Sequence, residues 1–286
     1  MQPGLYFDIS EERYHADDFG DGLHLSVSVA QALVLESEAH AYLRHPKLGG
    51  EPVVPNNDMD RGSLIHALLL GKGRELAIIE CDDWKSPKNR ALRDEHREAG
   101  RLAVTRKLYE VSVRAAEELQ KKLAHHGYAL TGQSEATLIW EEEATNGAKV
   151  RCRGRMDHLF NGSEIYDLKI TTDANPRTLA RGQLARMGYD IQGVAYPRGL
   201  EYVDARLRGR TSFTLLFCEP EPPYCVTPVA LAGSLRELGT RKWQRAIDAW
   251  ERCTRTGQWR DYTDAVFYAE ARPWELADEG DPEAAA

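Results

Sequence analysis

The sequence predicts a mixed α/β fold in which a central mixed β-sheet is flanked by helices. Three observations support this. First, apolar residues recur at helical spacing over most of residues 26–126. Second, apolar and polar residues alternate with period two between 136 and 171, as in strands. Third, the pattern predicts a helix, two strands and a final helix up to about residue 255. Strands in the middle of the chain, with helices before and after them, are typical of a sheet covered by helical layers.

Four helices are expected in the first part of the chain, at 26–44, about 58–70, 88–101 and 104–126. Ser26 or Ser28 can cap the first helix, and Gly71 with Gly73 ends the second. The segment 46–55 between them contains prolines at both ends and is predicted to be a loop.

Five strands are expected after residue 130, at 136–140, 149–160, 164–171, 211–219 and 224–231, with helices at 177–203 and 233–255. The pair Asn161-Gly162 is a turn signal between two alternating runs, so the second and third strands are predicted to form a hairpin.

The chain is long enough, at 286 residues, for one large domain with an ample core. It contains neither an internal repeat nor a long Gly/Ser linker. We therefore expect a single domain, made of a helical lead (1–57) packed on a core (58–260) and followed by an acidic tail (261–286).

The net charge of −8 by itself argues against broad binding of nucleic acid. Local charge differs, however: residues 84–107 hold eight Lys or Arg against three acids, and 149–155 hold four more cations. Acids gather at 141–143 and from Glu275 onward. The surface is either polarised or carries an ordinary solvated helix at 84–107, and the sequence leaves both open.

The localisation expected from the sequence is the cytoplasm. No apolar run approaches the roughly 18 residues that span a bilayer, and residues 1–15 lack the pattern of a secretory signal. The five cysteines are odd in number and scattered without a CxxC pair, which predicts neither a disulfide framework nor a zinc or iron–sulfur site.

The strand at 164–171 has two unlike faces. Tyr166, Leu168 and Ile170 share an apolar face, whereas Asp167 and Lys169 share the opposite one. An acid and a lysine two residues apart are either a solvent-facing alternation or a polar pair held on a rigid scaffold for chemistry.

The position of Asp157 on the preceding strand depends on the turn. A two-residue loop at Asn161-Gly162 would pair Asp157 with Tyr166, whereas an odd loop or a bulge would place it opposite Asp167. Two carboxylates on one face could share a hard cation such as Mg²⁺, and a lysine beside them could orient or deprotonate the attacking water. An active site here therefore requires an odd loop or a bulge.

The G-x-x-D ending at Asp157, followed by a strand with D-x-K, resembles the PD-(D/E)XK nuclease superfamily, and more narrowly the phage-type exonucleases related to exonuclease VIII (RecE) and the nuclease domain of RecB. Other segments are similar in the same order: the lead YHADDFGDGLHLSVSVAQAL, RGSLIHALLL with Gly62 and His66, SEATLIW with Glu135, and QGVAY with Gln192 and Tyr196.

This resemblance spans about residues 10–205 and implies a restriction-endonuclease-like core. It implies that Asp157 and Asp167 are metal ligands, with the carbonyl of Leu168 as a third ligand and His66 completing the shell. Lys169 would be the catalytic lysine.

The resemblance also implies that Glu135 is an outer acid acting through water or a second ion, and that Gln192 and Tyr196 orient the site or contact the DNA backbone. Arg151, Arg153 and Arg155 share the strand parity of Asp157. They are predicted either to hold phosphates or to solvate the strand.

The activity implied is that of a Mg²⁺-dependent exodeoxyribonuclease that accepts Mn²⁺ and digests double-stranded DNA from its ends, 5′ to 3′, in phage-type recombination. The family further implies a ring-forming homo-oligomer, a single-strand annealing protein as partner, and the cytoplasm of a bacterium or phage-infected host. Two alternatives are a Cas4-like or helicase-associated nuclease, although the chain lacks a P-loop, and an inactive DNA-end-binding scaffold.

Overall fold

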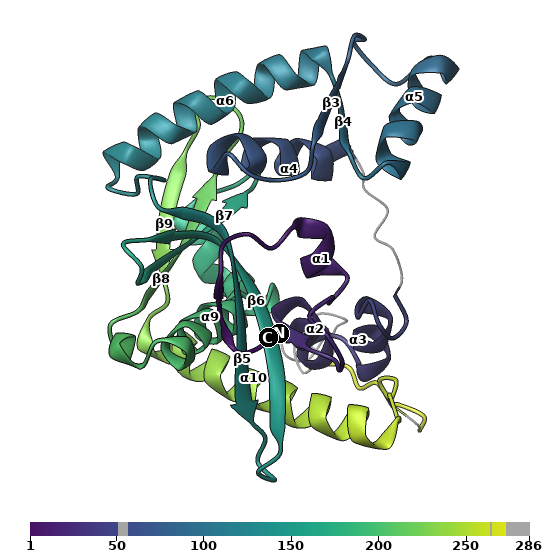
Figure 1. Cartoon of the computed structure of the whole chain (residues 1–286), viewed down its shortest axis with the longest axis vertical. Helices are drawn as coiled ribbons and strands as arrows, with labels where there is room; N and C mark the ends of the chain where they lie inside the picture. The colour runs from purple at the N-terminus through teal and green to yellow at the C-terminus, as the bar shows by residue number, and fades with distance from the viewer. Residues whose placement is uncertain (51–56, 264, 273–286) are drawn as a thin grey trace, which may run out of the picture.

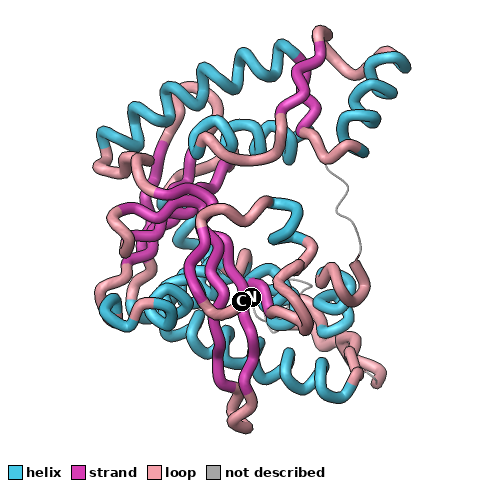
Figure 2. The backbone as a smooth tube through the Cα atoms, viewed as in Figure 1, coloured by secondary structure: helices cyan, strands magenta, loops and turns pink. Residues whose placement is uncertain are grey.

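The computed structural model describes residues 1–50, 57–263 and 265–272, and the side chains of all of these except 57–60. It confirms the predicted fold class, because a mixed sheet lies at the centre with helices on both sides (Figure 1, Figure 2). The seven-stranded sheet has the order β1-β5-β6-β7-β8-β9, with β2 beside β6. Its strands are β1 (Gly4–Tyr6), β2 (Leu25–Ser26), β5 (Gln133–Glu143), β6 (Lys149–Phe160), β7 (Glu164–Ile170), β8 (Ser212–Cys218) and β9 (Val226–Ala230).

Parallel pairing occurs between β7 and β8 and between β2 and β6, and the other neighbours are antiparallel. The longer helices are α1 (Glu11–His15), α2 (Val27–Leu35), α3 (Glu38–Arg44), α4 (Asn57–Leu70), α5 (Pro87–Glu98), α6 (Arg106–His125), α9 (Tyr189–Val203) and α10 (Gly233–Thr256). Shorter turns of helix fill Pro176–Arg186 and Ala205–Leu207.

The two faces of the sheet pack on different helices. The larger core joins α2, α9 and α10 to one face, and a second core joins α4 and α6 to the other (Figure 1). In β7, Ile165 belongs to the first core, while Tyr166 and Leu168 belong to the second, with Ile170 packed against it. The predicted apolar face of this strand is therefore confirmed, and it anchors β7 beneath α4 and α6.

Two predicted helices are interrupted. The expected helix 26–44 stops at Leu35, and a new helix begins after Ser37, whose hydroxyl accepts a hydrogen bond from the backbone N–H of His40. The expected helix 177–203 is broken where Gly182 and Gly188 adopt positive φ values of 82° and 71°. A left-handed residue cannot continue a right-handed helix, so each glycine reorients the chain.

The prediction missed four short strands. β3 (Leu76–Ile79) and β4 (Leu102–Thr105) form a separate two-stranded parallel sheet, and Thr105 caps α6, which therefore begins later than expected. β1 pairs with β5 and β2 pairs with β6, so the N-terminal lead adds strands to the central sheet. Runs of two to four residues are too short for their alternation to be recognised.

Some predictions fall partly outside the described residues. The expected loop 46–55 includes 51–56, and the expected acidic tail includes 264 and 273–286. The proposed boundaries of the lead, core and tail stay predictions. Across the part of the chain that the structure describes, none of the helices combines the length and the apolar character needed to span a membrane.

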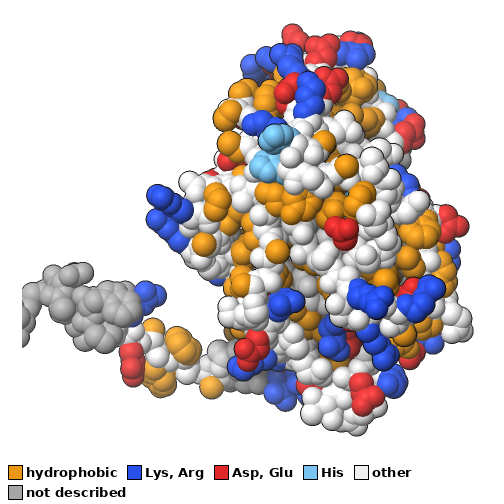
Figure 3. Space-filling view, turned by 90° about the vertical axis from the view of Figure 1, so that its left-hand side faces the viewer, with side chains coloured by type: hydrophobic (Ala, Val, Ile, Leu, Met, Phe, Trp, Pro, Cys, Tyr) orange, Lys and Arg blue, Asp and Glu red, His pale blue; other side chains and the backbone are white. Residues whose placement is uncertain are grey.

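Figure 3 shows the molecule from the side of β8 and β9. Lys and Arg side chains occur among Asp and Glu on this face, most clearly at its upper end. The helix α5 lies at the upper right of Figure 1 and contains half of the predicted basic segment 84–107. Several of its neighbouring charges are paired, including Lys85 with Asp83 and Arg106 with Glu80.

Candidate active site

The hairpin between β6 and β7 has the odd loop that an active site requires. Its ladder begins with the pair Phe160 and Glu164, so the turn consists of the three residues 161–163. With this register Asp157 comes opposite Asp167, on the same face. The geometric condition drawn from the sequence is therefore confirmed.

The turn itself explains why these residues are Asn and Gly. Asn161 and Gly162 both have positive φ, at 49° and 76°. Gly adopts this conformation without steric cost, and Asn tolerates it better than most residues. The register that brings the two aspartates together comes from the three-residue length of this turn, in which both residues adopt left-handed conformations.

Asp157 occupies the point where the two strands separate. The regular ladder ends with His158 and Tyr166. The next contact is made by a side chain, because Oδ2 of Asp157 accepts a hydrogen bond from the backbone N–H of Leu168 at 2.8 Å. The N–H and C=O of one strand residue point to the same side, so the Leu168 carbonyl faces the same gap. Its predicted role as a metal ligand is compatible with this position and stays a prediction.

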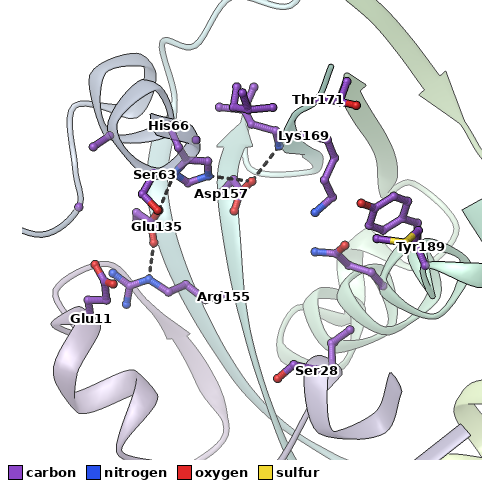
Figure 4. Close-up of a pocket in the computed structure, with 18 of the residues that line it drawn as sticks. Glu11, Ser28, Ser63, His66, Glu135, Arg155, Asp157, Lys169, Thr171 and Tyr189 are labelled. Carbon is purple, nitrogen blue, oxygen red and sulfur yellow. Dashed lines mark hydrogen bonds and ion pairs between the residues drawn. The ribbon is translucent and has the colours of Figure 1, made fainter. Parts of the chain in front are cut away.

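His66 joins Asp157 from helix α4. Its Nε2 lies 3.1 Å from Oδ2 of Asp157, and its Nδ1 lies 3.8 Å from Oε1 of Glu135 (Figure 4). Burial favours the neutral imidazole, but the charge and hydrogen bond of Asp157, with Glu135 and Asp167 farther away, raise the pKa of His66 to about 9.

Glu135 lies beside this pair on β5. Its backbone has a φ of 57°, which is unusual for a residue other than glycine and costs about 1–3 kcal/mol. The Arg155 guanidinium donates a hydrogen bond to its carboxylate, while burial raises the pKa of Glu135. Such local strain is retained only when its surroundings enforce it, as at many functional sites.

Asp167 and Lys169 form the second half of the site. Asp167 is only 1% exposed, its Oδ1 pairs with the Lys169 ammonium, and its Oδ2 accepts a hydrogen bond from the Gln192 amide. Burial raises the pKa of Asp167 to about 6 despite the nearby lysine, and the Asp157 charge adds to the rise. Burial would lower the pKa of Lys169, but Asp167 and Asp157 outweigh it and raise that pKa, so the ammonium stays charged.

The two aspartates are thus electrostatically unlike. Burial would also raise the pKa of Asp157, but His66, Lys169 and the Leu168 N–H hold it below its ordinary value. At mildly acidic pH, where Asp167 takes up a proton, Asp157 is the carboxyl that stays ionised.

Gln192 and Tyr196 come from α9, one turn apart. Gln192 contacts Asp167 directly, as described above, and also hydrogen-bonds to Tyr196. Tyr196 is buried in the larger core with part of its side chain lining the site. Its ring lies against Gly154, where a Cβ would come within 2.7 Å of the Tyr196 Cε1 atom. Tyr196 therefore contacts both Gly154 of β6 and Gln192.

A pocket of about 850 Å³ contains these groups. It is bounded by α4 on one side, by α1 and the start of α2 on the other, and by the first turns of α9 at its end (Figure 4). All the predicted catalytic and metal-binding side chains line it except Asp167, which lies beneath Lys169.

The donor atoms in this pocket suit a divalent cation. Among the described residues, His66, Glu135 and Asp157 each offer a ligand atom within 4.8 Å of the others. One imidazole nitrogen with carboxylate oxygens is a common ligand set for divalent metal ions. Glu135, predicted as an outer acid, belongs to this group itself, whereas both oxygens of Asp167 are engaged by Lys169 and Gln192.

The three predicted phosphate-binding arginines have different surroundings. Arg153 is only 3% exposed, lies 3.3 Å from the carboxylate of Asp17 and donates to the Tyr14 carbonyl. Its guanidinium is directed into the protein, so a phosphate contact is corrected to a structural role. Arg155 lines the pocket but pairs with Glu135, and Arg151 is exposed at the outer part of β6.

Sequence reasoning missed several residues that line the pocket. Tyr189, Gln31, Glu11 and Arg74 are among them. Tyr189 precedes Gln192 by three residues and so shares a helical face with it, which is a signal that could have been used. The others come from segments whose approach to the site depends on the tertiary fold.

A central mixed sheet with an aspartate on one strand and an Asp-x-Lys on its hairpin partner defines the class as the PD-(D/E)XK nuclease superfamily. The chain belongs to the family described as a PDDEXK-like domain of unknown function (DUF3799), whose profile matches residues 26–271.

One solved structure supports the fold. The chain is similar to the crystal structure of a "Putative exonuclease" from Eubacterium rectale, with a TM-score of 0.60, 14% identity, and coverage of 94% of this chain and 98% of that one. A weaker similarity, with a TM-score of 0.33 at 12% identity, relates 82% of this chain to 97% of a phage related exonuclease from Haemophilus somnus. Among curated proteins, none matches the chain in sequence.

Proposed function

We propose that this protein is a Mg²⁺-dependent exodeoxyribonuclease that hydrolyses double-stranded DNA from its ends, with Mn²⁺ able to replace Mg²⁺. The observation that carries the proposal is the group His66, Glu135 and Asp157, which offers donors for a cation in the pocket that Lys169 also lines. The fold is shared with the protein described as a "Putative exonuclease".

Each residue of the site has a distinct role in the proposed reaction. His66, Glu135 and Asp157 would hold the cation, and Asp167 would join them if Lys169 or Gln192 released one of its oxygens. The cation would supply charge neutralisation at the phosphate and a water of lowered pKa. Lys169, kept charged by its carboxylate neighbours, stabilises negative charge that grows on the phosphate. Gln192 holds Asp167, which in turn orients Lys169.

Contacts of the N-terminal lead (1–57) with the rest of the protein support the proposal that the enzyme acts at DNA ends. Arg74, just beyond α4, pairs with Glu11 of α1 at 3.5 Å and so joins the two sides of the pocket. The lead is held in place because Lys72 donates to the Phe7 carbonyl and Arg155 to the Ile9 carbonyl. A pocket bridged on one side admits a strand terminus more readily than the interior of a continuous duplex.

Further parts of the proposal rest on the family resemblance. These are 5′-to-3′ polarity, a role in phage-type recombination, a ring-forming homo-oligomer and an annealing protein as partner. Exposed cations on and beside α5, such as Lys88, are available for sequence-independent contact with duplex phosphates.

The experiment is digestion of a linear duplex labelled at its 5′ or 3′ end, compared with a covalently closed circle, in Mg²⁺, Mn²⁺ or EDTA. We expect metal-dependent loss of the linear duplex, earlier release of the 5′ label and a resistant circle. The variant Asp157→Asn should lose activity, whereas the control Asp18→Asn, at an exposed acid of the lead, should keep it.

Each outcome addresses a different part of the proposal. Cleavage of the circle would indicate an endonuclease, and earlier release of the 3′ label would reverse the polarity. Binding of DNA ends without cleavage in either metal would favour the inactive scaffold. Full activity of Asp157→Asn would refute the assignment of the site.

A further inference from the structure

The ring of Tyr189 lies against the ammonium group of Lys169. Lys169 Nζ is 4.9 Å from the ring centroid, while Asp167 pairs with the same ammonium (Figure 4 shows Lys169 and Tyr189 side by side). Both Lys169 and Tyr189 line the pocket. The ammonium is therefore held between a carboxylate and an aromatic face.

We infer that Tyr189 is a positioning residue that fixes Lys169 for catalysis through the face of its ring. This inference rests on the proposed nuclease function and adds a residue to it. Tyr189 acts through Lys169 and is not assigned a contact with the substrate.

The physical argument concerns the freedom of a lysine side chain. Lysine has a flexible four-carbon stem and a compact charge. An ion pair with Asp167 alone fixes one direction, because the ammonium can rotate around the carboxylate. An aromatic face attracts a cation through its quadrupole, so the ring supplies a second direction and limits where the ammonium can lie.

The ring is itself held in place by its neighbours. It packs against the ring of Phe217 of β8, with ring centroids 5.8 Å apart in a T-shaped arrangement. Phe217 is fully buried, and its backbone is paired with that of Lys169 across the parallel strands β7 and β8. The same strand pair therefore carries both the lysine and the support of the ring that faces it.

The start of α9 is fixed by two other helices. Gln31 of α2 donates from Nε2 to the Gly188 carbonyl at 3.0 Å, and a Cβ at Gly188 would lie 2.7 Å from Cγ of Gln31. Lys242 of α10 contacts both the buried Asp190 carboxylate and the Ala185 carbonyl at 2.8 Å. The break between α8 (Leu184–Arg186) and α9 is thus an anchored joint, and Tyr189 is the first residue after it.

Two variants distinguish the effect of the aromatic face of Tyr189 on kcat from the effects of its hydroxyl group and of its side-chain volume. Tyr189→Phe keeps the aromatic face, whereas Tyr189→Leu replaces it with an apolar side chain without a quadrupole. We expect Tyr189→Phe to keep nearly full kcat, and Tyr189→Leu to lose about 3- to 30-fold in kcat, which corresponds to the usual range of a cation–π contact. KM for DNA and the affinity for Mn²⁺ should stay unchanged. Tyr202→Leu, at an exposed tyrosine of the same helix, is the matched control and should behave as wild type.

A spectroscopic readout does not depend on activity. In protein labelled with ¹³C at the lysine ε-carbon, the protons attached to that carbon can be observed, and those of Lys169 are assigned with Lys169→Arg. Because they lie near an aromatic face, they should show an upfield ring-current shift. We expect this shift in wild type and Tyr189→Phe and its loss in Tyr189→Leu.

Gln31→Leu tests the anchored joint. It should lower kcat in the same direction as Tyr189→Leu, and the double variant should lose less than the product of the two single losses, because both act on one lysine.

Several results would overturn the inference. Wild-type kcat in Tyr189→Leu, an equal loss in Tyr189→Phe, a change confined to KM, or an unshifted lysine resonance in wild type would each do so. Absence of cleavage by the wild type would instead refute the proposed function, and the NMR comparison would still decide whether the ring holds Lys169.

Discussion

Binding of a metal ion at this site should displace a proton from His66. In the metal-free protein the pKa of His66 is about 9, because the Asp157 and Glu135 charges outweigh the effect of burial. A metal ligand must be the neutral imidazole. At pH 7 only about one molecule in 100 has that form, so apparent affinity for Mg²⁺ should be about 100-fold, or about 2.7 kcal/mol, below its value at high pH.

The assay is isothermal titration calorimetry with Mg²⁺ between pH 6.5 and 8.5, repeated in buffers of different ionisation enthalpy to count released protons. We expect about tenfold tighter binding per pH unit and release of about one proton. His66→Ala should bind more weakly and lose this pH dependence. His15→Gln, at a histidine of the pocket outside the donor group, should retain it.

Stability of the metal-free protein should change in the opposite direction. A folded pKa above the ordinary 6.5 means that the His66 interaction stabilises the fold fully below pH 6.5, and that this contribution is lost as pH rises through about 9. Metal affinity thus rises over the range in which metal-free stability falls. Mg²⁺ binding that releases no proton at pH 7, or that keeps its pH dependence in His66→Ala, would refute the placement of His66 as a ligand.

Three further predictions concern the scaffold of the site. Asp17 is fully buried and contacts Arg153 and two histidines, so Asp17→Asn should lower the free energy of unfolding in urea by about 3–5 kcal/mol; a loss below about 1 kcal/mol would contradict this. Gly154→Ala places a Cβ 2.7 Å from the Tyr196 ring and should cost about 1–3 kcal/mol in thermal unfolding, partly restored by adding Tyr196→Leu. Deletion of Ser163 leaves a two-residue turn, which moves Asp157 to the other face of the hairpin. Mg²⁺ binding should then disappear, while the far-ultraviolet circular dichroism spectrum is retained. Preserved Mg²⁺ binding would refute the argument that the turn length places Asp157 in the site.

The part of the site contained in one hairpin could be predicted from the sequence. Alternation along 164–170 assigns Asp167 and Lys169 to one face, and the same periodicity states which turn length Asp157 requires. The sequence could not choose between the two turns by itself. The folded hairpin has the three-residue turn 161–163, which the strand pairing shows directly.

Contacts between segments far apart in the chain could not be predicted from the sequence pattern. Arg153 has the strand parity of Asp157, yet it is buried because the lead brings Asp17 against it. The resemblance implies that Glu135 is an outer acid, and only the structure shows that its carboxylate lies 3.8 Å from His66 Nδ1. Periodicity describes neighbours along a strand or helix and contains no information on which other element will cover a given face.

The sequence by itself determined the fold class, the polar and apolar faces of β7, and the order of the residues that define the superfamily. These follow from local periodicity and spacing, which the backbone geometry of each element imposes. Only the tertiary structure decided that α4, β5 and the hairpin converge on one pocket, that Arg153 is structural, and that Tyr189 covers Lys169. These features depend on packing between elements far apart in the chain, where burial and electrostatics of the assembled site set the positions and the pKa values.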